Sequence, residues 1–477
     1  MDIFRLCIIF FLIATTCVIG IMLYFRVKIE YIYLAAALCL GTTYMLVITP
    51  LSVPDESYHY HSSLVLSGYI MLQEEPAIVE RHLIDFSGSR VHFNVPDMYL
   101  RLLDKGIYIT HEESENVDIQ GDYSLYYPLW YLPQALGITI ARLIGLNIFG
   151  VFYLGRFFNL LFYSMCVFLS IKRLKTLKLP LFLIGLLPMG LHQAASFSYD
   201  TFINGISILF ITYIISCTYE KVDFRWRDYA MLFVLGILLA PAKIVYLPLI
   251  FLVLMIAWRW QGENKGRVWI VASSIVTVSV LAATLISGVR TLDIAAESMG
   301  YEGVETYSLS FAIQYPMQTI LIFLRTIYQD IGFYISSTFG RHLSGETLVL
   351  PKTMIMIIIG LFIAGAFYGE KDEWQPIISD RIVYLCVSIV VVTLCMASMF
   401  FGWTSNFRDT IMGVQGRYFY PLLPLGILII RYNRFLILQR LYLNAVIAAF
   451  IIMQGVVILY VLNYTVDSLY LLSPYLT

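Results

Sequence analysis

Charged residues are scarce in this sequence. Only 13% of its 477 residues are Asp, Glu, Lys or Arg, whereas 59% are hydrophobic and the mean hydropathy is +0.78. Because about a quarter of a soluble domain is charged, this composition excludes an ordinary soluble domain and predicts an integral membrane protein embedded in the lipid bilayer. The formal net charge is −1, so no basic excess indicates a nucleic-acid partner.

Cysteine is absent from the candidate loops. All seven cysteines lie in apolar runs: Cys7, Cys17, Cys39, Cys166, Cys217, Cys386 and Cys395. This placement excludes a disulfide framework or a zinc site in an outer domain, because both need cysteines outside the membrane. The short links also contain no glycine-rich phosphate-binding motif, which excludes an ATPase module.

About twelve apolar runs have the length that a membrane span needs, roughly 20 residues or slightly fewer. They are residues 5–25, 30–50, 150–171, 179–196, 201–219, 229–241, 244–258, 268–287, 352–368, 381–401, 417–430 and 441–463. Short basic links such as 172–178 and 259–267 are expected on the cytoplasmic side by the positive-inside rule. We therefore predict an all-α polytopic membrane protein, a single membrane domain over residues 1–477 with both termini outside.

Two further apolar stretches, residues 128–145 and 317–338, do not fit as spans. A crossing at 128–145 would invert every later segment and place the basic link 172–178 outside. We expect both stretches to be interfacial or re-entrant helices. Residues 51–127 then form a large first extracytoplasmic loop, and residues 402–416 form a smaller outer loop.

The first outer loop opens on the motif "PDESYHYH", residues 54–61. Proline suits the first turn of a helix, and Asp55 and Glu56 suit its positive N-terminal end. If the segment is helical, Asp55 and His59 share one face at i, i+4 spacing, where they can tune a base or bind a metal. The alternative is a capped interfacial helix with solvated acids.

A second acid lies in "SFSYDTFING", residues 196–205, at the outward end of another span. Asp200 is the only acid there, and Asn204 follows one turn later. Burying such an acid is costly, so it is a functional candidate. The alternative is that Asp200 only caps the next helix.

Basic and polar side chains are expected at the same depth. Arg156 lies near the outer end of its span, Lys243 lies at the tip of a hairpin, and "VQGRYFYPLLP" presents Gln415, Arg417 and Tyr418. Each can be a snorkelling anchor. Together, such cations suit a lipid phosphate or pyrophosphate, because Arg gives bidentate contacts and Lys a point charge.

These motifs resemble the polytopic GT-C glycosyltransferases. Within that superfamily the chain is most similar to a bacterial "predicted membrane protein" family, a domain of unknown function. The resemblance rests on "PDESYHYH", "YYPLWYLPQALG", "SFSYD", "APAKIVYLP" and "VQGRYFYPLLP" in this order. It covers nearly the whole chain and implies a GT-C-like fold in the bacterial plasma membrane with an active site facing outward.

The resemblance further implies an inverting transferase that moves a sugar from a polyprenyl-phosphate or polyprenyl-pyrophosphate carrier to a cell-envelope glycan or glycopolymer. Asp55 would be the general base, with Glu56 as a second candidate, and Asp200 would orient the site. Where a divalent cation such as Mg²⁺ or Mn²⁺ is used, Asp55, His59 and Asp200 are its candidate ligands. The implied donor-phosphate and pocket residues are Arg156, Lys243, Gln415, Arg417 and Tyr418, with His59, Tyr199, Asn204 and Tyr246 nearby.

Two other functions remain open at this point. A lipid-linked oligosaccharide flippase or transporter would need charged residues along mid-membrane helices, whereas the span centres here have almost none. A polysaccharide polymerase or ligase shares the lipid-linked chemistry and is barely distinguished by sequence.

Overall fold

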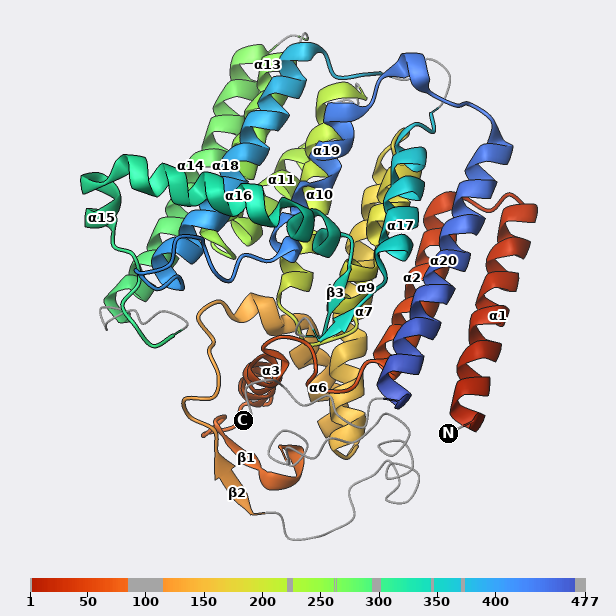
Figure 1. Ribbon diagram of the computed structural model, residues 1–477, viewed down its shortest axis with the longest axis vertical. Coiled ribbons are helices and arrows are strands. Elements are labelled where there is room, and N and C mark those ends of the chain that lie inside the picture. Colours follow the sequence, from red (N-terminus) through yellow and green to blue (C-terminus); the bar gives the residue numbers. More distant parts are fainter. Residues whose placement is uncertain are drawn as a thin grey trace.

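The computed structural model describes residues 2–84, 115–220, 226–260, 262, 264–293, 302–344, 347–369 and 374–467. Nearly all of the regular structure is helical, as the composition predicts (Figure 1). The centre of the predicted first loop, residues 85–114, lies outside the described residues.

Seven helices in the described part are long and apolar enough to cross a membrane. They are α1 (Asp2–Tyr24), α2 (Ile29–Val47), α7 (Ile148–Arg173), α10 (Asp200–Tyr219), α14 (Lys265–Asp293), α18 (Ile378–Gly402) and α20 (Arg440–Asp467). Each coincides with one of the twelve predicted spans. The multi-pass membrane architecture is therefore confirmed, with seven long helices in place.

The other five predicted spans are shorter or broken. Residues 179–196 form α8 (Lys178–Gly185) and α9 (Pro188–Ala194) rather than one helix. The break falls at Leu187, which is extended, because a proline disfavours the helical conformation in the residue before it. The remaining elements are α11 (Trp226–Leu239), η3 (Ile244–Tyr246), α12 (Leu247–Ile250), η4 (Phe251–Val253), α13 (Leu254–Arg259), α17 (Lys352–Ala366), η5 (Gly416–Leu422) and α19 (Leu423–Ile430).

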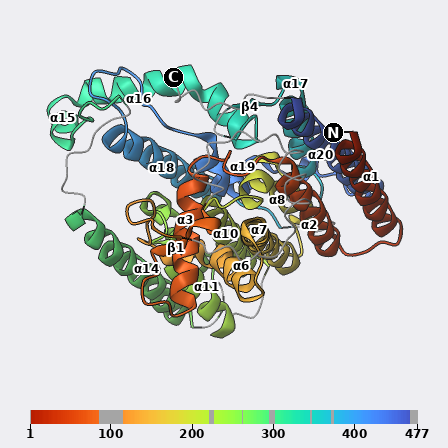
Figure 2. The same cartoon turned by 90° about the horizontal axis from the view of Figure 1, so that it is seen from below.

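Two helices run across the direction of the long helices. The helix α3 (Glu56–Ile70) is seen end-on in Figure 1 and lengthwise in Figure 2, so it runs across the long helices. The helix α16 (Pro316–Thr338), preceded by α15 (Leu309–Gln314), runs across the direction of the long helices in Figure 1. Such an orientation fits the interfacial helix expected at 317–338. The stretch 128–145 becomes η2 (Pro128–Tyr131) and α6 (Leu132–Leu143).

Small antiparallel pairs complete the regular structure. The strand β1 (Ile78–Glu80) pairs with β2 (Asn116–Asp118), and β3 (His342–Leu343) pairs with β4 (Leu348–Val349). Two single-turn helices, η1 (Arg81–Leu83) and η6 (Asn433–Phe435), lie in connections. These pairs are short departures from the predicted all-α fold.

The helix α7 is central, because α2, α6 and α10 all pack against it. The contact with α6 is so close that a Cβ atom on Gly137 would collide with the backbone of Leu154, and glycine permits this approach because it has no side chain. In the same way, a side chain on Gly416 would collide with α16 at Tyr334 and Ser337. The segment that carries Arg417 is thereby fixed against α16.

The two ends of the bundle differ. In Figure 1 the start of α1 and the end of α20 lie at the end that carries α3, β1 and β2. The end of α13 and the end of α19, each followed by a basic link, lie at the opposite end. The charge pattern predicts this separation of two faces; which face is external stays a prediction.

Candidate functional site

Asp200, the first residue of α10, is the centre of a buried charge cluster. The Nζ atom of Lys243 lies 3.7 Å from its Oδ1 atom, and Nε of Arg417 lies 3.2 Å from its Oδ2 atom. Asp200 is only 6% exposed. The structure thus brings together three of the predicted site residues from distant motifs. Two cations face one carboxylate, so the cluster carries one surplus positive charge.

The turn before α10 is held in place by amide side chains. Nδ2 of Asn159 on α7 donates to the carbonyl oxygens of Ser196 and Ser198, at 2.7 and 3.2 Å. Nε2 of Gln193 donates to Oδ2 of Asp200 at 3.2 Å, and Nδ2 of Asn204 donates to Oε1 of Gln193 at 2.9 Å. Because the amide of Gln193 is itself anchored, the carboxylate of Asp200 has a fixed orientation.

Aromatic rings surround Lys243. Its Nζ atom lies 4.2 Å from the ring centre of Tyr418 and 5.5 Å from that of Tyr199, both cation–π distances. The hydroxyl of Tyr246 donates to the carbonyl oxygen of Tyr418 at 2.9 Å and fixes this segment. Burial acts to lower the pKa of Lys243, but Tyr199 and Asp200 outweigh it, so its pKa stays above its usual value. The ammonium is therefore charged near neutral pH.

His59 on α3 lies beside this cluster as a neutral group. Its Nδ1 atom is 3.1 Å from the hydroxyl of Tyr131, and its ring centre is 4.9 Å from that of Tyr199. Burial lowers the pKa of His59 to about 3, a shift that the charges of Arg417 and Lys243 reinforce and that of Asp200 opposes. His59 is thus a hydrogen-bonding residue near neutral pH rather than a cation.

Glu56 and Arg156 form a separate, fully buried ion pair. Arg156 donates from Nε and its NH2 nitrogen to the two carboxylate oxygens of Glu56, at 2.9 and 2.8 Å, and neither side chain is exposed. Arg156 also donates to the carbonyl oxygen of Ile48 at the end of α2, and Glu56 accepts from the N–H of Phe197. The pair therefore joins α2, α3 and α7, and we infer a structural role for both residues.

Asp55 has the opposite environment to its neighbour. It is exposed, its φ angle is +58°, and its side chain makes no capping hydrogen bond with α3. A non-glycine residue in this left-handed region is uncommon, and such residues gather at functional sites. Asp55 is therefore available to a ligand, and its convergence with Asp200 stays a prediction.

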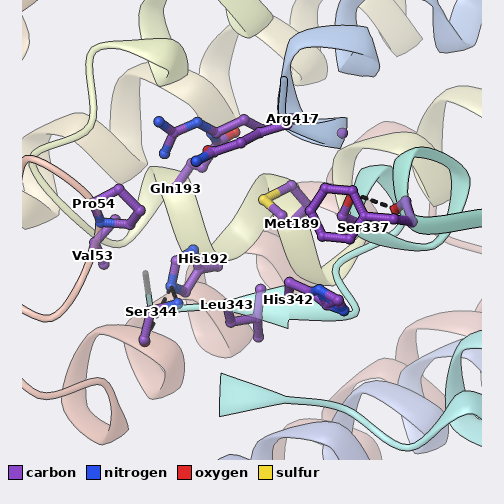
Figure 3. A pocket seen from close by; sticks show the side chains of 13 residues that line it. Val53, Pro54, Met189, His192, Gln193, Ser337, His342, Leu343, Ser344 and Arg417 are labelled. Carbon is purple, nitrogen blue, oxygen red and sulfur yellow. Dashed lines mark hydrogen bonds between the residues drawn. The ribbon is translucent and has the colours of Figure 1, made fainter. Parts of the chain in front are cut away.

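One pocket is lined both by the segment that precedes Asp55 and by residues that contact Asp200 (Figure 3). Pro54, which precedes Asp55, lines it together with Gln193 and Arg417, which both contact Asp200. Its full lining is Val53, Pro54, Met189, His192, Gln193, Phe333, Ser337, His342, Leu343, Ser344, Gln415, Gly416 and Arg417. The predicted Gln415 is thus a pocket residue.

The donor atoms do not form a metal-ligand set. In the part of the chain that the structure describes, no three His, Cys, Asp or Glu side chains are grouped so that they could hold a metal ion. The oxygens of Asp200 instead face Lys243 and Arg417, which already supply positive charge. The expected ligand trio of Asp55, His59 and Asp200 is therefore not assembled in this arrangement.

Sequence reasoning missed three buried polar residues at the site: Asn159, His192 and Gln193. Each lies within an otherwise apolar segment, where a buried amide or imidazole needs a partner. Their positions inside runs of hydrophobic residues could have identified them as candidate site residues. Asn159 also follows Arg156 at i+3 spacing, so both face the same side of α7.

The site can therefore do two things chemically. The exposed carboxylate of Asp55 can accept a proton from a bound hydroxyl. Arg417 and Lys243, which exceed the charge of Asp200, can attract an anion, and a guanidinium has more N–H donors than one carboxylate occupies.

Comparison with known proteins agrees with the membrane architecture and adds no activity. No curated protein and no solved structure matches the chain significantly. A family model matches residues 38–426, which includes every element of the candidate site. The chain therefore belongs to the family described as "Predicted membrane protein (DUF2142)".

Proposed function

We propose that this protein is a membrane glycosyltransferase of the GT-C type. It would transfer a sugar from a polyprenyl-phosphate or polyprenyl-pyrophosphate carrier to a cell-envelope glycan or glycopolymer on the outer face of the bacterial plasma membrane. One observation carries the proposal: Pro54 and Arg417 line the same pocket, and the residue that follows Pro54 is the exposed Asp55. The carboxylate of Asp55 would reach a substrate in this pocket, so that a base and a cation act on the same molecule.

The proposed reaction is a single displacement at the anomeric carbon. The oxygen of an acceptor hydroxyl attacks that carbon while the carboxylate of Asp55 takes the hydroxyl proton. The bond between the anomeric carbon and the phosphate oxygen breaks, and its electron pair leaves with the phosphate. Attack opposite the leaving group inverts the configuration. A positioned base contributes about 10²–10⁴-fold to such a step.

The leaving phosphate explains the role of the cations. Negative charge increases on the phosphate oxygens as the bond breaks, and prearranged positive groups stabilise that charge. Arg417 lines the pocket, and Lys243 shares the carboxylate of Asp200 with it. Asp200 would therefore act as a positioning residue for both cations.

Arg417 and Lys243 remain our proposed donor-phosphate residues, while Arg156 is withdrawn from that set because Glu56 already occupies its guanidinium. Tyr418 and Tyr246 support Lys243 rather than the substrate. The proposed step does not use a divalent metal ion.

The proposal is tested by incubating the purified protein with a panel of polyprenyl-linked sugars and candidate acceptor glycans. Mass spectrometry should detect loss of the sugar from the carrier and a matching mass gain on an acceptor. Transport of an intact lipid-linked sugar between the two leaflets, with no new glycosidic bond for any donor, would contradict the proposal and favour a flippase.

A further inference from the structure

We infer that His192 donates a hydrogen bond from Nδ1 to a phosphate group bound in the pocket that Arg417 also lines. The inference rests on the proposed function for the identity of the anion. It adds a phosphate-binding residue that the sequence motifs do not indicate.

The proton on His192 is placed by its neighbour. The backbone N–H of Ser344, next to β3, points to Nε2 of His192 at 3.1 Å. An N–H group can only donate, so Nε2 is the acceptor and carries no proton. In a neutral imidazole the proton is then on Nδ1.

That Nδ1–H is buried without a partner. His192 is 2% exposed, and Nδ1 has no hydrogen-bond partner among the residues that the structure describes. A buried, unpaired donor is costly unless it has a role. His192 lines the pocket, and in Figure 3 it lies between Ser344 and the side chains of Gln193 and Arg417.

The pocket lining favours an anion with an apolar stem. No Asp or Glu occurs among its lining residues, whereas Arg417, His192 and Gln193 offer N–H groups. Met189 and Phe333 add apolar walls, and Phe333 belongs to α16, the helix expected at the membrane interface. A phosphate joined to a prenyl chain matches the chemistry of this lining, because the phosphate can accept from the N–H groups and the prenyl chain can contact the apolar walls.

Binding of farnesyl monophosphate, farnesol and inorganic phosphate to the detergent-purified protein tests the inference. The wild type should bind farnesyl monophosphate at least tenfold more tightly than farnesol. His192→Leu should weaken farnesyl monophosphate binding about ten- to hundredfold, the usual effect of a hydrogen bond to a charged group, with little change for farnesol. Equal affinities for the two lipids, or unchanged phosphate binding in His192→Leu, would overturn the inference.

Two amide variants of His192, His192→Asn and His192→Gln, test the same contact if His192→Leu does not fold. In His192→Asn the amide nitrogen lies as far from the backbone as Nδ1 does, so this variant should retain more affinity than His192→Gln, whose amide is one bond further out. The opposite order would overturn the assignment of the donor to Nδ1.

The measurement with inorganic phosphate shows whether the pocket binds a free phosphate or needs the prenyl chain. If it binds with the same dependence on His192, the pocket is a phosphate site that needs no lipid, and the inferred contact stands. These readouts need no sugar transfer. His192-dependent phosphate binding without any transfer would contradict the proposed function alone, whereas transfer with His192-independent phosphate binding would contradict this inference alone.

Discussion

Oδ2 of Asp200 lies 3.2 Å from Nε of Arg417, and both side chains are almost completely buried. Lys243 contacts the other oxygen of the same carboxylate. One acid from α10 therefore joins the hairpin tip after α11 to the segment η5. This contact places both cations near the pocket, so the charge of Asp200 matters to stability and to ligand binding alike.

Asp200→Asn should destabilise the protein strongly. The substitution leaves two largely buried cations without their counter-charge, and breaking a buried ion pair costs about 3–5 kcal/mol. Thermal unfolding in detergent measures the effect. Adding Lys243→Met to Asp200→Asn should recover part of the loss, because one uncompensated cation is then removed. A wild-type unfolding temperature for Asp200→Asn would show that the ion pairs do not support the fold.

Glu56→Gln should also destabilise the protein, but for a structural reason alone. Arg156 would keep its buried guanidinium without a carboxylate, at a cost of about 3–5 kcal/mol. The double variant Glu56→Gln/Arg156→Met should be more stable than Glu56→Gln. The folded fraction of Glu56→Gln should transfer sugar at close to the normal rate. Loss of transfer in well-folded Glu56→Gln would return Glu56 to the chemistry.

The buried imidazole of His59 predicts a dependence of stability on pH. Its pKa is about 3 in the folded protein, below the value of about 6.5 in the unfolded chain. The unfolded state therefore binds the proton first, and the stability contributed by neutral His59 is lost as the pH falls below 6.5. At pH 5 this loss is about 2 kcal/mol.

The His59→Gln variant isolates that effect. It lacks the titrating group, so the stability advantage of the wild type over the variant should shrink between pH 7 and pH 5. Chemical unfolding at several pH values measures the difference. An advantage that stays constant across this range would mean that His59 does not titrate on unfolding as its burial requires.

Much of the helical framework could be predicted from hydropathy. The seven long spans follow directly from runs of apolar residues. The break at Leu187 was missed because Pro188 lies inside an otherwise continuous apolar run. A proline can open a helix or interrupt one, and hydropathy does not distinguish the two cases.

The site was predictable in part. The sequence predicted that Lys243 and Arg417 lie at the same depth as Asp200, but as residues that bind a phosphate; their ion pairs with Asp200 were not predicted. The role of Arg156 could not be predicted from the sequence. The sequence does not show whether a buried arginine pairs with an acid of the protein, such as Glu56, or with a bound ligand. His192 was missed because the backbone N–H that fixes its tautomer comes from Ser344, far along the chain.

The most direct test of the account compares Asp55→Asn with Glu74→Gln in single-turnover sugar transfer by the purified protein. Both substitutions neutralise one exposed acid near α3, but only Asp55 follows a pocket residue, Pro54, in the sequence. Asp55→Asn should fold normally, bind the donor, and transfer sugar about 10²–10⁴-fold more slowly, as expected for a missing base, while Glu74→Gln should match the wild type. Transfer by Asp55→Asn at the wild-type rate would contradict the central claim that Asp55 is the general base.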